Sequence, residues 1–159
     1  MSLRISAIFL ITKESNPLEA KRFHIGDVMS VILNRIVSVE GVKGIQDFLE
    51  YMTGKNVWIH QIPRAAEVCK PYILSQLPEL DTPEISVLAH GELILMVEGM
   101  TDDDMKHKMV LGWLSSLSAK YGEEFLVKPL PEDVYDEGDP VAEYFDSAGS
   151  NSKIIILET

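Results

Sequence analysis

The sequence contains a single cysteine, Cys69, among its 159 residues. One cysteine excludes a disulfide within the chain and any zinc site built from cysteines, and it fits a reducing cytoplasm. We expect this thiol to be buried on the apolar side of a helix rather than to act as a nucleophile. No pair at metal-ligand spacing occurs among the four histidines, which are His24, His60, His90 and His107. We therefore predict no metal and no cofactor.

Basic residues are also scarce, with 14 Lys and Arg against 25 Asp and Glu and a formal net charge of −11. A strongly acidic surface repels nucleic acid and anionic lipid, so we predict no direct nucleic-acid partner. Such a surface suits a basic surface on another protein, including one that normally grips nucleic acid. The alternative is that the excess acid only keeps the protein soluble.

Long apolar runs are missing as well. None approaches the roughly 20 residues of a membrane-spanning helix. The apolar run at residues 5–11 lacks the small-residue cleavage site of a secretory signal. We therefore expect no membrane association and a cytoplasmic location.

Familiar catalytic motifs do not occur: the sequence has no phosphate-binding glycine loop, nucleophile elbow or dinucleotide fingerprint. Neighbouring carboxylates are present, but in a loop bounded by Pro and Gly they are usually just solvated. This pattern favours a protein that is not an enzyme, and leaves an enzyme with an unfamiliar site as an alternative.

Length and composition predict one compact domain over residues 1–159. Runs rich in β-branched and aliphatic residues predict strands at Ile5–Thr12, Ile85–Ala89, Glu92–Glu98, Phe125–Leu130 and Ile154–Leu157. With helices between them, these strands predict an α+β (or α/β) fold, with a mixed sheet of about four to five strands covered by helices.

Several helices are predicted between the strands. Residues 25–39 have apolar positions at helical spacing, but their many Val and Ile residues leave a pair of strands open. A second helix should start after Gly41 and end at Gly54, and a third should start at Pro63. In this third helix Pro71 should cause a kink or a restart.

The clearest helix signal follows Thr101. Thr101 and Asp104 form a capping-box pattern with Asp in place of Glu, and apolar residues then recur at helical spacing until Gly122. A short helix is expected at residues 141–148. Before the first of the helices, residues 13–22 should form a loop or a short solvated helix.

The segment Thr53–Arg64 departs furthest from what a generic soluble domain needs. It gathers four side chains able to bind a partner: Trp58, His60, Gln61 and Arg64. In a nucleotide site, Trp58 would stack on a base and Arg64 would hold a phosphate. In an enzyme, His60 would act as general acid or base.

We favour a structural interpretation of the same segment. Trp58 and Ile62 would then fill the core, while the polar side chains of the segment would satisfy carbonyl groups at the helix junction. The two interpretations differ in whether an open pocket or a filled core surrounds Trp58.

A second candidate surface is the acidic arm, defined as residues 131–140. It carries five acidic residues, which are Glu132, Asp133, Asp136, Glu137 and Asp139. We predict a solvated loop that presents these carboxylates to a partner.

Three stretches carry a resemblance to a known family: Ile25-Gly-Asp-Val-Met-Ser-Val, Met52-Thr-Gly-Lys-Asn-Val-Trp-Ile-His-Gln-Ile-Pro-Arg-Ala and Leu77-Pro-Glu-Leu. Together with Gly112-Trp-Leu and Tyr121-Gly-Glu-Glu, they resemble a family of uncharacterised bacteriophage and prophage proteins with a Thr-Gly-x-x-Leu-Phe-Thr-His-Gln-Leu-Pro-Arg motif. Ile59 stands where that motif has its second Thr, and the loss of this hydroxyl weakens the hypothesis that the motif is catalytic. The resemblance implies a viral genome and a bacterial cytoplasm, and no particular reaction.

These observations together predict a non-enzymatic phage accessory protein that binds and inhibits a host protein through an acidic surface. A counter-defence factor of the anti-CRISPR-like or other anti-immune kind fits this description. Two alternatives stay open, a nucleotide sponge or sensor that uses Trp58, His60 and Arg64, and a hydrolase that uses His60.

Overall fold

A computed structural model describes residues 20–150, with side chains as far as residue 146. The helices and strands follow in the order β1 (Lys21–His24), α2 (Ile25–Leu33), α3 (Val42–Thr53), η1 (Ile59–Gln61), α4 (Ile62–Gln76), η2 (Pro78–Leu80), η3 (Glu84–Ala89), α5 (His90–Val97), α6 (Asp103–Tyr121), β2 (Glu124–Val127) and α7 (Pro140–Ser150). Elements η1 and η2 are 3-10 helices and η3 is a π-helix. The described part of the chain is thus mostly helical.

The predicted sheet of about four to five strands is wrong. Within residues 20–150 the strands β1 and β2 form a two-stranded antiparallel sheet in which Phe23 faces Phe125. The predicted strands at residues 5–12 and 154–157 lie outside the described residues. The loop predicted through residue 22 is also wrong at its end, because Lys21 and Arg22 belong to β1.

The largest error concerns residues 85–98, which form η3 and α5 instead of strands. Ile85 and Leu93 are almost fully buried, whereas Leu88 and Leu95 are exposed. The run therefore buries one face of a helix, and its remaining aliphatic residues face outward. The two mostly apolar runs, on either side of His90-Gly91-Glu92, are each too short for their periodicity to distinguish helix from strand. Packing against α6 decides between the two.

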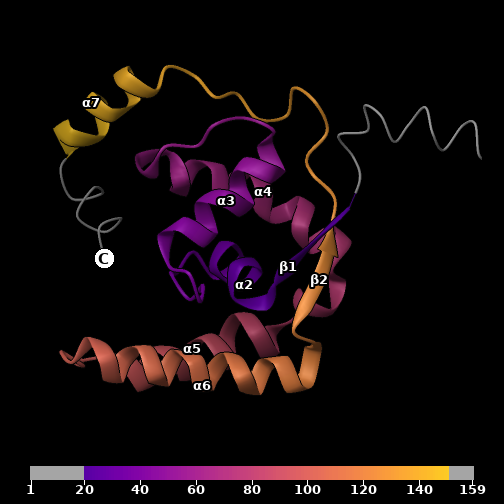
Figure 1. Cartoon of the computed structure of the whole chain (residues 1–159), viewed down its shortest axis with the longest axis vertical. Helices are drawn as coiled ribbons and strands as arrows, with labels where there is room; N and C mark the ends of the chain where they lie inside the picture. The colour runs from indigo at the N-terminus through magenta and orange to yellow at the C-terminus, as the bar shows by residue number, and fades with distance from the viewer. Residues whose placement is uncertain (1–19, 151–159) are drawn as a thin grey trace, which may run out of the picture.

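Side-chain contacts join η3 and α5 to α6. The indole Nε1 of Trp113 donates to the carbonyl of Ala89 at 2.9 Å. At the other end, Lys120 and Tyr121 of α6 both donate hydrogen bonds to the carboxylate of Glu84. Helices α5 and α6 lie side by side at the bottom of Figure 1.

The other helices agree better with the predictions. Of the predicted segment 25–39, residues 25–33 are helical and the helix ends at Asn34, so no pair of strands forms there. Helix α3 ends at Gly54, with φ 71°, as predicted. Helix α4 has Pro63 in its first turn and continues through Pro71 as one element, so no restart occurs. The cap of α6 is Asp102, not Thr101, because Asp102 accepts bonds from the amides of the following turn.

The buried apolar side chains form one cluster, to which α2, α3 and α4 contribute most. Phe48 at its centre is 0% exposed, and its ring centroid lies 4.5 Å from that of Phe23. Cys69 is also fully buried, as predicted, and burial raises the pKa of its thiol to about 12. None of the helices in residues 20–150 has the length and apolar character to cross a lipid bilayer.

After β2, the chain leaves the sheet and runs as the acidic arm along α3 and α4 to reach α7 (Figure 1). The arm is a loop, and α7 covers the predicted short helix at residues 141–148. The path of the arm brings it to the segment Thr53–Arg64.

Candidate functional site

The segment between α3 and α4 is held in place by short-range contacts. Gln46 of α3 donates to the carbonyl of Val57 at 2.7 Å, and Glu50 accepts from the amide of Val57 at 3.0 Å. Val57 and Ile62 are buried in the core. The backbone of the segment is therefore fixed to α3 on one side, and on the other side His60, Gln61 and Arg64 reach the arm and α7.

Gln61 is the most buried polar residue of the segment, with 0% of its surface exposed. Its Oε1 accepts from the amide of Trp58 at 3.0 Å. Its Nε2 donates to the carbonyl of Glu137 and to Oε1 of Glu143, both at 2.9 Å. A single carboxamide thus ties the start of α4 to the acidic arm and to α7.

Arg64 makes the strongest link to the arm. Its Nε and Nη2 form a two-point contact with the carboxylate of Glu143, at 2.9 and 3.0 Å. Its Nη1 donates to the carbonyl of Asp136 at 2.7 Å, and its guanidinium lies 4.8 Å from the ring centre of Tyr135. Such two-point Arg–carboxylate contacts fix orientation as well as adding energy.

His60 reaches the same region, with Nε2 donating to the carbonyl of Pro140 at 2.8 Å. Its ring also contacts Trp58 and Tyr144 edge to face, with centroids 5.7 and 5.4 Å away. Trp58 itself is 47% exposed, so it does not fill the core as the structural interpretation supposed. Ile62, the other residue of that interpretation, is buried in the core.

The acidic arm is consequently well anchored. Tyr135 is 2% exposed, and its carbonyl accepts from Nζ of Lys55 at 3.0 Å. All five predicted acidic residues of the arm are exposed. Two of them also shape the backbone, since Asp136 accepts from the amide of Gly138 and Asp139 caps α7.

The structure therefore brings together the two candidate sites of the sequence, the segment Thr53–Arg64 and the acidic arm. His60, Gln61 and Arg64 bind the arm and α7, and the five acidic residues of the arm stay exposed. A nucleotide at these three side chains would have to displace bonds that they already make. A groove of about 470 Å³ lies elsewhere, where His24 and Val39 face Leu111 and Leu114 of α6.

Glu143 and Tyr135 were missed by the sequence analysis. Their partners lie 71 and more residues away in the sequence, so no local pattern marks them. One indirect signal in the sequence could have pointed to Glu143: it is an acidic residue in the first turn of a predicted helix, directly after an acidic loop. Across residues 20–150, no group of three or more His, Cys, Asp and Glu side chains is placed to hold a metal.

The contact between Arg64 and Glu143 predicts a pH dependence. The hydrogen bond from Arg64 lowers the pKa of Glu143 below its ordinary value of 4.5, against burial, which raises it. The pKa of Glu143 is thus lower in the folded protein than in the unfolded chain. The stabilisation from this contact is complete at a pH above the pKa of the unfolded chain, and it is lost as the pH falls through the pKa of the folded protein. We expect α7 to loosen only below about pH 4.5.

This dependence can be measured by the fluorescence of Trp58, which contacts His60 beneath α7, during an acid titration. In Glu143→Gln the corresponding change should be absent, and at neutral pH this variant should lose about 1 kcal/mol of stability because Arg64 is partly exposed. Identical titration curves for the parent and Glu143→Gln would contradict the assignment.

Tyr135 supplies a second prediction. Its hydroxyl is buried and has no hydrogen-bond partner among the described residues. A buried hydroxyl without a partner costs about 1–3 kcal/mol. Tyr135→Phe keeps the ring against Arg64 and removes that cost, so thermal unfolding should show a stability that is higher by about 1–3 kcal/mol. A clear loss of stability would mean that the hydroxyl does have a partner.

Comparison with known proteins gives one match. No curated protein and no solved structure is significantly similar to the chain. Residues 23–82 match the model of a family described as a domain of unknown function (DUF7736). The matched range includes α2, α3 and the whole segment Thr53–Arg64, and it ends before α5, α6 and the acidic arm. The chain is thus similar, over the part that contains α2, α3 and α4, to an uncharacterised domain.

Proposed function

We propose that this chain is a non-enzymatic phage accessory protein that binds and inhibits a protein of its bacterial host in the cytoplasm. The observation that carries the proposal is the anchoring of the acidic arm. Lys55, Gln61 and Arg64 all bind backbone carbonyls of the arm, and its carboxylates are left exposed. A loop held in this way loses little conformational freedom on binding, which favours affinity.

Charge points to the class of partner. The arm is part of a chain with a net charge of −11, which raises the rate of encounter with a basic surface. Host proteins that grip nucleic acid carry such surfaces, and an acidic inhibitor can occupy them. This is the basis for a counter-defence role. The resemblance to phage proteins supports the viral setting of the proposal.

The test is neutralisation of the arm in an isosteric variant. The variant carries five substitutions: Glu132→Gln, Asp133→Asn, Asp136→Asn, Glu137→Gln and Asp139→Asn. The amide oxygens of Asn can still accept the bonds that Asp136 and Asp139 make, and Asn suits the positive φ of 69° at residue 133. The fold should therefore be kept, and circular dichroism checks it.

We expect the variant to capture at least about tenfold less host protein from a bacterial lysate. Capture by the parent should also fall steeply between about 0.05 and about 0.5 M salt, because exposed charges are screened over about 10 Å at 0.1 M. The matched control neutralises five exposed acids away from the arm: Glu92, Glu98, Asp103, Asp104 and Glu124. Capture that is insensitive to salt, or equal for the two variants, would refute the arm as the binding surface.

A further inference from the structure

Helix α7 is attached to the rest of the molecule in an unusual orientation. A surface helix normally buries its apolar face and exposes its polar one. In α7 the polar residue Glu143 faces inward, where it binds Gln61 and Arg64. The apolar residues Val141, Tyr144 and Phe145 are 54%, 45% and 66% exposed. Their spacing places them on one face of the helix, and that face is open.

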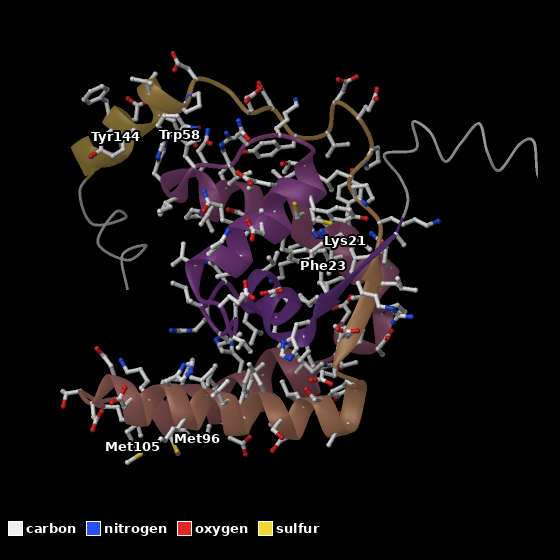
Figure 2. The ribbon with its side chains drawn as sticks, viewed as in Figure 1. Lys21, Phe23, Trp58, Met96, Met105 and Tyr144 are labelled. Atoms are coloured by element: carbon white, nitrogen blue, oxygen red, sulfur yellow. The ribbon has the colours of Figure 1, made fainter. Side chains whose placement is uncertain are left out.

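The open face continues onto η1. The ring centroids of Tyr144 and Phe145 are 5.7 Å apart, and His60 links Tyr144 to Trp58. Figure 2 shows Trp58 and Tyr144 at the same end of the molecule, where α7 lies next to η1, far from Met96 and Met105. We call this surface the aromatic ridge, and it consists of Trp58, Ile59, Val141, Tyr144 and Phe145. All five side chains are between 45% and 66% exposed.

The charge around the aromatic ridge decides what could cover it. No Lys or Arg occurs between Lys128 and Lys153, and this stretch contains seven Asp and Glu residues. A second copy of the chain would bring the same negative charge to the contact, and nucleic acid or an anionic lipid surface would be repelled. A cationic partner is attracted by the carboxylates, and Lys or Arg can also lie on the faces of Trp and Tyr rings.

We infer that the aromatic ridge is the docking site for a cationic amphipathic helix of the partner protein, with an apolar anchor residue flanked by Lys or Arg. This inference rests on the proposed function and adds the chemistry of the partner. The apolar anchor packs on Phe145 and Trp58, and the basic residues meet the acidic arm beside it. Exposed Trp and Tyr side chains are the types that contribute most to binding at protein interfaces. An amphipathic helix on an apolar surface is a common mode of recognition.

The experiment uses three synthetic peptides of equal length as probes, with binding followed by fluorescence anisotropy at about 0.1 M salt. The first is an amphipathic helix of Leu and Lys, the second has Glu in place of every Lys, and the third has Lys at all positions. We expect the Leu/Lys peptide to bind more tightly than the other two. No binding of the Leu/Lys peptide, or equal binding of the all-Lys peptide, would overturn the inference.

Single substitutions then locate the site. Phe145→Ala and Trp58→Ala should each weaken binding of the Leu/Lys peptide about tenfold. Both side chains are largely exposed, so the fold should be kept. The matched control is Leu95→Ala, which removes an apolar side chain that is 78% exposed on α5 and should leave binding unchanged. If all three variants bind the Leu/Lys peptide with equal affinity, the inference is overturned. It is also overturned if the parent protein forms dimers that Phe145→Ala abolishes, because the aromatic ridge would then bind a second copy of the chain.

The two proposals fail separately in this design. If neutralising the arm abolishes capture of host protein while Phe145→Ala and Trp58→Ala leave it unchanged, the acidic arm binds the partner and the aromatic ridge does not. If the arm variant still captures host protein at the level of the parent, the proposed function itself is wrong.

Discussion

Gln61→Ala should release the acidic arm and α7 from the helical core. The substitution removes bonds to the amide of Trp58, the carbonyl of Glu137 and the carboxylate of Glu143. Each bond contributes about 1 kcal/mol, and groups left buried without a partner cost more. Two of these bonds reach the arm and α7, so we expect a loss of about 2 kcal/mol in the docking of the arm, which is a roughly thirtyfold rise in its released population.

Limited digestion with a protease that cleaves after acidic residues measures this release, because the arm carries several such sites. Gln76→Ala is the matched control. Its carboxamide also makes two bonds to backbone, both to Lys128, but these bonds are exposed. Digestion of Gln76→Ala should resemble that of the parent. Equal cleavage rates for Gln61→Ala and the parent would show that Arg64 and His60 suffice to hold the arm.

Phe48→Ala should cause the largest loss of global stability. The side chain is 0% exposed, and its ring packs against Phe23 of β1 at 4.5 Å between centroids. Truncating a buried Phe removes its burial and leaves a cavity, at a cost of about 3–5 kcal/mol. For a chain of this size, the midpoint of thermal unfolding should fall by on the order of 10 °C.

Phe145→Ala is the matched control for this substitution, since the same change is made at a side chain that is 66% exposed. Its unfolding midpoint should lie close to that of the parent, because surface substitutions usually change stability by less than about 0.5 kcal/mol. A large loss in Phe145→Ala would mean that α7 is buried against a surface that the described residues do not include.

Local features of the chain were predicted correctly where one residue type has a strong conformational preference. Gly54 ends α3 because a left-handed conformation costs glycine little. Pro63 lies in the first turn of α4, where its missing amide hydrogen is not needed. The acidic arm was also identified, because a run of carboxylates between prolines cannot contribute to an apolar core.

The strands were the weak point, and the reason is visible in α5. The runs at residues 85–89 and 93–97 are mostly apolar, short, and separated by His90-Gly91-Glu92, so neither the helical nor the strand period stands out in them. The conformation was decided by Trp113 and Glu84, which join η3 and α5 to α6. Strand β1 was missed for a similar reason, since its pairing with β2 joins residues about a hundred positions apart.

Composition and local backbone preference act within a few residues. They were enough to predict the acidic character of the protein, the C-terminal ends of α3 and α6, and the residues of the two candidate segments. The bonds from Gln61 and Arg64 to Glu143 and the arm could not be predicted in this way, and neither could the open apolar face of α7. These bonds join residues 79 and 82 positions apart, which only long-range packing brings together.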